Sequence, residues 1–274
     1  MIALAIHPAQ RELLLLLCAR LEVGALLNPT RRPLPGAPVP VFAGMGELLD
    51  HGAPRACVFL WPYPGLKEDA LACLERGIPT LSAGPVPGIA LRWGGQHRFS
   101  PLFQAALAQR HSPEFGEPVY LRRLVAGGDL QASWWAACQA LAEARDLVDA
   151  PLAEIQVAAC KEGRKHHLAL SVSFANGAFA HLLAAPVHCS PSLDLTLLGS
   201  GGLAFSDSAA NLPALVRKEG ARLQPPAFLF PEPAWVQDFL DHLDQPAPDC
   251  SFQMQLLGAG RRAARLRKLV RALP

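Results

Sequence analysis

The first third of the chain alternates short apolar runs with longer segments whose apolar residues recur at helical spacing. The runs typical of buried strands are Ile2–Ile6, Val23–Leu27, Val41-Phe42, Ala56–Leu60, Ile78–Leu81 and Ile89–Trp93. The segments that predict helices are Ala9–Arg20, Met45–Asp50 and Leu66–Arg76. Strands that alternate with helices in this way indicate right-handed β-α-β units, so we expect an α/β domain with a parallel sheet.

The pattern changes in the second part of the chain, where one predicted helix, Ser133–Val148, is surrounded by strands. Those strands are Val119–Val125, Glu154–Cys160, His167–Phe174, Ala178–Ala184, Leu193–Leu198 and Leu203–Phe205. Asn176-Gly177 predicts a tight hairpin, because both residues tolerate positive φ. We therefore expect a large open, mostly antiparallel sheet with helices on one face. Glu232–Leu243 and Phe252–Leu273 are predicted to close the chain as helices.

A joint, Trp93–Tyr120, connects these two parts. It contains Arg98-Phe99-Ser100-Pro101, a run of helical length, and then Phe115-Gly116-Glu117-Pro118. The change of pattern across it predicts two domains, residues 1–93 and residues 94–274.

The composition of the chain indicates which kinds of binding partner to expect. Charged residues make up 18% of the chain and the net charge is +2, so we expect neither nucleic acid nor a membrane surface as a partner. The basic run near the C-terminus is interpreted as the solvated face of an amphipathic helix. Because 51% of the residues are hydrophobic, part of the apolar surface is expected to lie in a subunit interface.

Cysteine usage and the N-terminal pattern predict a cytoplasmic protein. Seven cysteines are spread along the chain without a C-x-x-C pair, which argues against a disulfide framework or a thiolate zinc site and fits buried free thiols. The apolar run Leu13–Leu17 is bordered by charged residues and is too short to span a bilayer, so we interpret it as the buried face of a first helix.

Histidines gather at His166-His167, His181 and His188-Cys189. On a strand, adjacent residues point to opposite faces, so each pair offers one ligand to a given side. No acidic residue lies within these pairs. We expect ordinary sheet-face histidines there and no metal site.

Five short motifs follow one another along nearly the whole chain. They are Ala56–Pro62 (ACVFLWP), Ala70–Pro79 (ALACLERGIP), Arg98–Pro101 with Gly116–Pro118 (RFSP and GEP), Phe174–Ala178 (FANGA), and Leu197–Asp207 (LLGSGGLAFSD). In this order they resemble the Gfo/Idh/MocA family, the glucose–fructose oxidoreductase and inositol dehydrogenase group. The resemblance implies a Rossmann-like dinucleotide domain followed by an α/β domain on an open sheet. It also implies hydride transfer between a nicotinamide cofactor and a sugar, cyclitol or related small molecule, and assembly through the sheet.

The positions that would bind the cofactor in that family carry other residues here. Its phosphate loop, G-x-G-x-x-G, corresponds to His7–Glu12 (HPAQRE), which has no glycine, and its ribose-binding acid corresponds to Asn28. Its Glu-Lys-Pro corresponds to Ala83-Gly84-Pro85, which lacks the lysine. The cofactor positions are therefore occupied by His7, Gln10, Asn28, Gly84 and Pro85.

The positions that would be catalytic in that family also carry other residues here. The family's D-x-x-x-H element corresponds to Trp135 and Gln139, and neither is a general acid or base. Helices are also missing after Asn28 and between Pro85 and Arg98, so the first domain is trimmed. The residues expected near a cleft are Trp61, Tyr63, His97, Arg98, Trp135 and Gln139. Arg98 could bind an anionic substrate group or join the domains through a salt bridge, and we favour the second.

Two hypotheses remain open. In the first, the chain is a degenerate member that does not transfer hydride, needs no cofactor, and acts as a partner subunit, scaffold or small-molecule binder. It would associate with itself, or with another protein of the family, through the open sheet. In the second, it is an NAD(P)-dependent oxidoreductase with non-standard cofactor contacts, and Trp61, Tyr63 and Gln139 lie near the reaction. We favour the first, because the phosphate loop, the lysine and the histidine are missing together.

Overall fold

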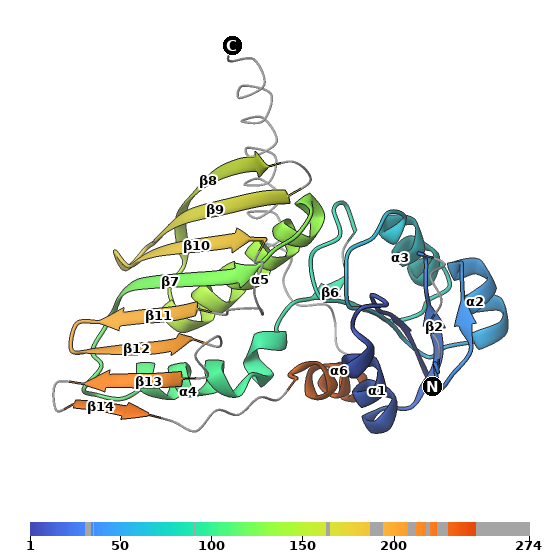
Figure 1. Ribbon diagram of the computed structural model, residues 1–274, viewed down its shortest axis with the longest axis horizontal. Helices are drawn as coiled ribbons and strands as arrows, with labels where there is room; N and C mark the ends of the chain where they lie inside the picture. The colour runs from blue at the N-terminus through green and yellow to red at the C-terminus, as the bar shows by residue number, and fades with distance from the viewer. Residues whose placement is uncertain are drawn as a thin grey trace, which may run out of the picture. The chain divides into compact units, whose positions relative to one another are not determined.

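The chain folds into two compact units, each with its own sheet (Figure 1). The computed structural model describes residues 1–30, 34, 36–89, 91–162, 165–186, 194–207, 212–217, 220–223 and 230–244. The first unit contains the chain up to Phe99 together with helix α6 (Glu232–Asp241), and the second begins at Ser100. The boundary that we expected after residue 93 lies a few residues before this division. The expected domains did not include α6 in the first unit.

The first unit is built on a parallel sheet of six strands, as the sequence predicts. They are β1 (Ile2–Ala5), β2 (Val23–Leu27), β3 (Val41–Phe42), β4 (Cys57–Phe59), β5 (Thr80–Ser82) and β6 (Arg92–Trp93). The spatial order is β3-β2-β1-β4-β5-β6. The helices between the strands are α1 (Arg11–Arg20), α2 (Met45–Gly52) and α3 (Leu66–Glu75). The direction of winding reverses between β1 and β4, and open α/β sheets bind ligands at such a switch point.

Helix α6 packs on the part of the first unit where a connecting helix is missing. Among the described residues, no α-helix separates β2 from β3 or β5 from β6. Trp235 of α6 donates from Nε1 to the carbonyl of Gly94, just after β6, at 2.8 Å. The Arg92 guanidinium lies 5.9 Å from the centre of the Phe239 ring. A helix from much later in the chain therefore completes this end of the unit.

The second unit is an eight-stranded sheet of mixed direction. Its strands are β7 (Pro118–Ala126), β8 (Leu152–Glu162), β9 (Lys165–Phe174), β10 (Phe179–Ala185), β11 (Asp194–Gly199), β12 (Gly202–Asp207), β13 (Leu212–Arg217) and β14 (Gly220–Leu223). Only the β7–β10 pair is parallel among its described neighbours, which confirms the mostly antiparallel prediction. Strands β13 and β14 were not predicted. In β13, Pro213 interrupts the apolar pattern and cannot donate to a ladder.

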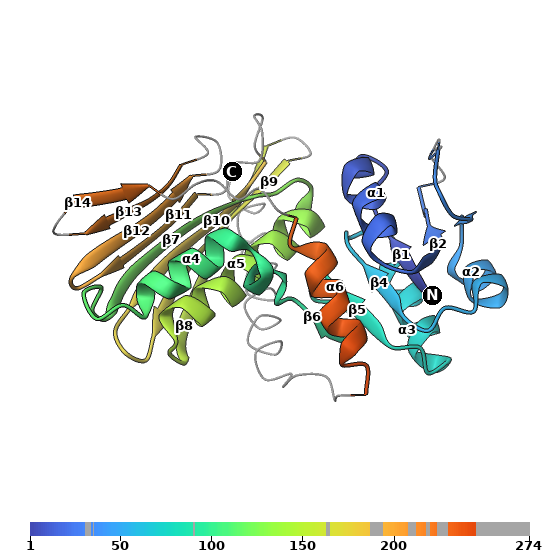
Figure 2. The same cartoon turned by 90° about the horizontal axis from the view of Figure 1, so that it is seen from below.

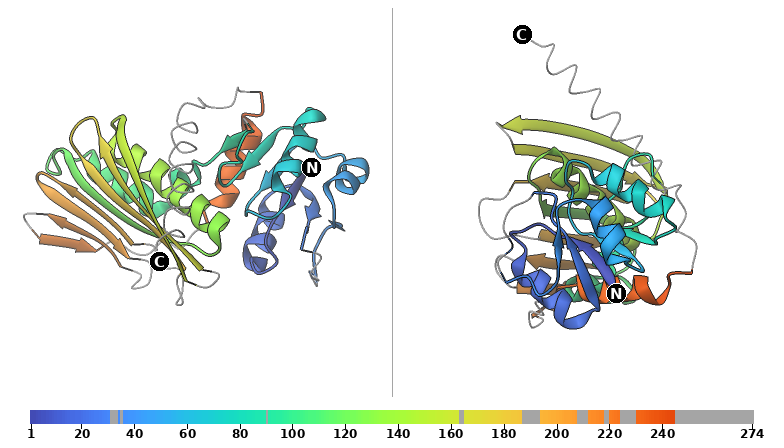
Figure 3. Two further views of the ribbon diagram at one scale, coloured as in Figure 1. Left: turned by 90° about the horizontal axis from the view of Figure 1, so that it is seen from above. Right: turned by 90° about the vertical axis from the view of Figure 1, so that its right-hand side faces the viewer.

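Helices α4 (Pro101–Arg110) and α5 (Leu130–Val148) cover one face of this sheet (Figures 2 and 3). Helix α5 begins before the predicted Ser133, because Asp129 caps it: the carboxylate accepts from the Ala132 N–H at 2.9 Å. It ends at Val148, and its C-cap residue Asp149 adopts a left-handed conformation with φ 56°. The expected position of helices on one face is confirmed.

The end of the joint docks on the β11–β12 turn. The Gly201 N–H donates to the Phe115 carbonyl at 2.9 Å, and the Ser200 N–H donates to the Glu117 carbonyl at 3.0 Å. Gly116 has φ +71°, and a Cβ there would lie 2.1 Å from the Ser200 hydroxyl, so only glycine fits. The G-E-P and G-S-G-G motifs, far apart in sequence, therefore form one structural unit.

Two other expectations concern the ends of the chain. The helix predicted over 252–273 lies outside the described residues. Among the described residues, none of the helices combines the length and apolar character needed to cross a membrane.

Candidate functional site

Three aromatic side chains meet at the switch point of the first sheet. His7 follows β1 and Trp61 follows β4, and their rings contact edge to face with centres 4.7 Å apart. Tyr63 continues the group, with its ring centre 5.3 Å from that of Trp61. The structure thus brings together one expected cofactor position and two expected cleft residues. Sequence analysis singled out each of them but did not predict their contact.

The loop between β1 and α1 uses its backbone N–H groups for hydrogen bonds within the loop. The Ala9 N–H donates to Nδ1 of His7 at 3.1 Å, and the Gln10 N–H donates to the His7 carbonyl at 2.8 Å. Pro8 has no N–H. Helix α1 consequently begins at Arg11 rather than at the predicted Ala9, and the exposed side chain of Gln10 makes no capping bond. A phosphate loop needs these backbone donors to point outward, towards the ligand.

Asn28 lies at the end of β2, where the ribose-binding acid is expected. It is 3% exposed, and its Oδ1 accepts a hydrogen bond of 2.7 Å from the Thr30 hydroxyl. The carboxamide oxygen thus serves the turn that follows the strand.

Gly84 and Pro85, at the position of the missing lysine, are both buried. The Ser82 hydroxyl donates to the Gly84 carbonyl at 2.7 Å. This bond holds the chain close to the end of β5. The segment therefore contributes packing rather than a proton donor at this point.

Tyr63 is held by an acidic residue that sequence analysis missed. Its hydroxyl donates to Oδ2 of Asp69, on α3, at 2.8 Å. Burial, and then the Asp69 charge, raise the pKa of Tyr63, so the phenol remains protonated. Burial also raises the pKa of Asp69, although the bond from Tyr63 acts in the opposite direction. The sequence signal for this pair was an acidic residue in the first turn of the predicted helix that follows Trp61-Pro62-Tyr63.

The remaining cleft candidates lie apart from this aromatic group along the chain. His97 and Arg98 are in the short 3-10 helix η1 (Gln96–Phe99), where Arg98 is exposed. Trp135 and Gln139 lie on α5 in the second unit; Trp135 is buried and Gln139 is half-buried. A buried indole on the covered side of a helix favours packing for Trp135.

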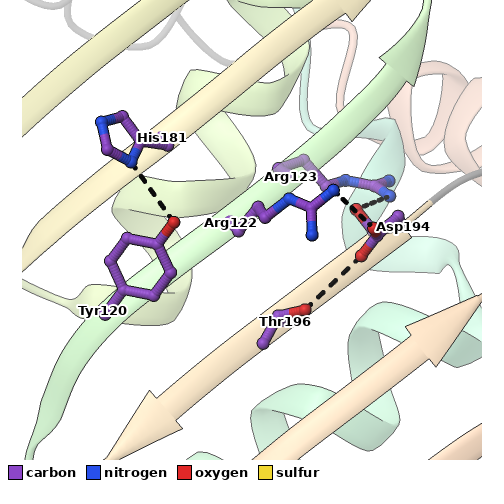
Figure 4. A network of polar contacts seen from close by, with 6 residues as sticks. All are labelled: Tyr120, Arg122, Arg123, His181, Asp194 and Thr196. Atoms are coloured by element: carbon purple, nitrogen blue, oxygen red, sulfur yellow. Dashed lines mark hydrogen bonds and ion pairs between the residues drawn. The ribbon is translucent and has the colours of Figure 1, made fainter.

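The acidic residue one turn beyond Gln139 has a structural partner. Nε of Arg123, on β7, donates to Glu143 at 2.6 Å, and both side chains are nearly buried. Arg123 also donates to the Asp194 carbonyl at 3.5 Å (Figure 4). The Glu143 carboxylate is therefore engaged between α5 and the sheet.

Metal ligation by the usual hard or borderline donors has no support in the described part of the chain. No cluster of three or more His, Cys, Asp or Glu side chains lies there in a position to hold an ion. His181 instead contacts the Tyr120 and Phe179 rings.

No protein-family model and no curated protein matches the chain. Solved structures do match over almost the whole length. A dehydrogenase from Chromobacterium violaceum has a TM-score of 0.73 at 15% identity, covering 99% of this chain and 97% of that one. UDP-N-acetylglucosamine 3-dehydrogenase from Acidithiobacillus ferrooxidans has a TM-score of 0.72 at 15% identity, covering 96% and 95%.

A third similar structure contains a cofactor. An oxidoreductase from Agrobacterium radiobacter, in complex with NAD+, L-tartaric acid and magnesium, has a TM-score of 0.70 at 13% identity, covering 96% of each chain. The comparisons therefore give no support to the expectation that this chain needs no cofactor. At these identities they establish architecture rather than activity. The structural neighbours are dehydrogenases and oxidoreductases of the Gfo/Idh/MocA type, and the chain has their fold.

Proposed function

We propose that this chain does not transfer hydride to or from a nicotinamide cofactor, and that it acts as a partner subunit, scaffold or small-molecule binder. The observation that carries the proposal is the group of contacts at the switch point of the first sheet. The His7 and Trp61 rings contact each other across the ends of β1 and β4, and the loop donates two of its N–H groups to His7.

Binding a dinucleotide at this point requires several changes at once. The pyrophosphate of NAD(P) needs outward N–H groups and close approach of a glycine backbone. Here the bonds from Ala9 and Gln10 to His7 would have to break. Glu12, in the first turn of α1, also places a negative charge near the expected phosphate. Each of these effects opposes binding.

Loss of acid–base groups adds to the argument. No lysine stands at Gly84 or Pro85, and Trp135 and Gln139 stand where the family has an acid and a histidine. Losing a positioned acid or base typically costs about 10²–10⁴-fold in rate. Of the other polar groups, Tyr63 is already bonded to Asp69 in the first unit, and Glu143 to Arg123 in the second.

The alternative is an NAD(P)-dependent oxidoreductase with non-standard cofactor contacts. It is favoured by one observation, the NAD+ bound to the Agrobacterium radiobacter enzyme of the same fold. In that case Trp61, Tyr63 and Gln139 would lie near the reaction, and the His7 ring would turn away to admit the cofactor.

Titration with NADH and NADPH distinguishes the proposed function from the alternative. We expect no submillimolar binding, measured by calorimetry and by the quenching of tryptophan fluorescence, because the loop donors are used internally. An NAD+-binding dehydrogenase of this fold serves as positive control, and a cooperative thermal melt shows that the chain is folded. Submillimolar binding of either nucleotide would contradict the proposal and support the oxidoreductase.

Association would use the outer face of the second sheet, which we define as the side opposite α4 and α5. Strand alternation places Tyr120, Arg122, Phe179, His181, Leu183, Thr196 and Leu198 on this face. Leu183 and Leu198 are each 41% exposed. Such exposed leucines beside an aromatic group are typical of interfaces.

Polar contacts order the centre of the outer face (Figure 4). Tyr120 Oη and Nδ1 of His181 lie 3.3 Å apart. The Arg122 guanidinium lies 3.3 Å from the Asp194 carboxylate. Paired charges cost less to bury than isolated ones, which supports a second copy, or another protein of this fold, as the occupant.

The mass in solution tests this association. We expect the protein to run as an oligomer in light scattering and native mass spectrometry, and Leu198→Asp to shift it towards the monomer, because a buried unpaired charge is costly. Leu74→Asp is the matched control, since Leu74 is similarly exposed, at 37%, but lies on α3 in the first unit. A purely monomeric chain with no co-purifying partner, or equal effects of both variants, would count against the outer face.

A further inference from the structure

Three sulfur side chains converge inside the first unit, from three separate elements. Cys57 lies on β4, Cys73 on α3, and Met45 at the first position of α2. The Cys73 Sγ and Met45 Sδ atoms are 3.7 Å apart, and the Cys57 thiol lies close enough to Cys73 to interact with it. Exposure is 1% for Cys57, 0% for Cys73 and 4% for Met45. We call these three residues the sulfur cluster.

Regular secondary structure explains why they meet. Cys57 and Phe59 point to the same face of β4, because side chains alternate along a strand. Leu66, Ala70 and Cys73 form the buried stripe of α3 at helical spacing. Thr80, on β5, is the register neighbour of Cys57. The wide sequence spacing of the cysteines hides this arrangement from motif analysis.

The distance between two of these sulfur atoms suits a trigonal metal centre. Metal–thiolate bonds of about 2.3 Å place three sulfur ligands roughly 4 Å from one another in a trigonal plane. The separation of 3.7 Å between Cys73 and Met45 agrees with this value. Little movement is therefore needed for the two sulfur atoms to share an ion.

The donor set selects the kind of ion. Thiolate and thioether ligands are soft and favour Cu(I), whereas Zn²⁺ structural sites take four nitrogen, oxygen or thiolate ligands. The described residues supply no group of three or more His, Cys, Asp or Glu that could hold an ion. We propose that Met45, Cys57 and Cys73 form a three-sulfur binding site for a soft monovalent metal ion, Cu(I).

Binding of the ion by the two cysteines requires the loss of their thiol protons. Each coordinating thiol exchanges its S–H bond for a Cu–S bond and releases a proton to solvent, with no change of oxidation state.

Access is provided at the start of α2. Met45 lies between Gly44 and Gly46, and this helix has no side-chain cap at Gly44. Displacing its first turn therefore breaks no side-chain cap, although it does break the hydrogen bond of 3.2 Å from the Leu48 N–H to the Gly44 carbonyl. Met45 can swing aside and then close over the ion as the third ligand.

Anaerobic competition with a coloured Cu(I) chelator tests the site. The background variant has the other cysteines replaced (Cys18, Cys138, Cys160, Cys189 and Cys250), so that only Cys57 and Cys73 remain. It is expected to take one equivalent of Cu(I) and to melt at a higher temperature when loaded. Met45→Leu, which conserves volume, should weaken binding by at least about tenfold. Cys73→Ala should abolish it.

Several results would overturn the assignment. One is failure of the folded background variant to remove Cu(I) from the chelator. Another is uptake that Met45→Leu and Cys73→Ala leave unchanged. Tighter binding of Zn²⁺ than of Cu(I) would contradict the softness argument. Reduction with dithiothreitol before the titration, and removal of the reductant, excludes a Cys57–Cys73 disulfide as the cause of a negative result. The outcome is independent of whether NAD(P) binds.

Discussion

Replacing Glu143 by alanine is expected to lower the free energy of unfolding by about 3–5 kcal/mol, because it leaves the Arg123 guanidinium buried without its partner. The ion pair is 2.6 Å long, with side-chain exposures of 12% for Arg123 and 6% for Glu143. Urea denaturation of the purified chain measures the loss. Arg123 keeps only a long bond to the Asp194 carbonyl in the variant.

The double replacement Glu143→Leu with Arg123→Met is the control. Removing both charges leaves no isolated ion, so this variant is expected to retain most of the stability lost by Glu143→Ala. A loss as large in the double variant as in the single one would show that packing, rather than the charge, dominates.

Gly199→Ala is expected to destabilise the second unit by roughly 3 kcal/mol, because no space exists for the added methyl group. A Cβ at this position would lie 2.3 Å from the Phe115 carbonyl oxygen and 2.5 Å from its ring. Phe115 is fully buried, so it cannot move aside without disturbing the docked joint. Thermal unfolding followed by circular dichroism checks the size of the effect.

Gly128→Ala provides a matched comparison in the same unit. The nearest atom to an added Cβ there is the Ala132 Cβ at 3.5 Å, an ordinary contact. This variant is expected to be neutral or slightly stabilising, by up to about 1 kcal/mol, through the unfolded chain. Equal losses in the two glycine variants would refute the steric argument for Gly199.

Sequence patterns predicted the helices and strands of this fold better than they predicted which elements pack against one another. β2 and β3 fall at the residues where the apolar runs lie. Helix α6 was predicted, but its packing beside β6 was not, because periodicity says which face of a helix is apolar and nothing about what covers it. Strand β13 was missed at Pro213, and the start of α1 was displaced by the His7 side chain, which takes the Ala9 N–H.

The candidate site was predicted in composition but not in geometry. The absence of glycine after β1 was visible, whereas the contact between His7 and Trp61 depends on strand order, which places β4 beside β1. Asp69 and Cys73 share one face of α3, yet their partners Tyr63 and Cys57 come from before the helix. Such pairs need the folded register of strand and helix, and single-sequence spacing does not contain it.

The return of α6 to the first unit has a consequence for biosynthesis. Gly94 and Trp235 are 141 residues apart, and Arg92 bonds to the His242 carbonyl across 150 residues. During translation the first unit emerges early, but β6 and the residues after it wait for α6 until nearly the whole chain has been made. Loops of this length close slowly. The second unit's strands β7 to β12 can pair meanwhile, so the unit that begins first in the sequence is expected to finish folding last, exposed to chaperones in the interval.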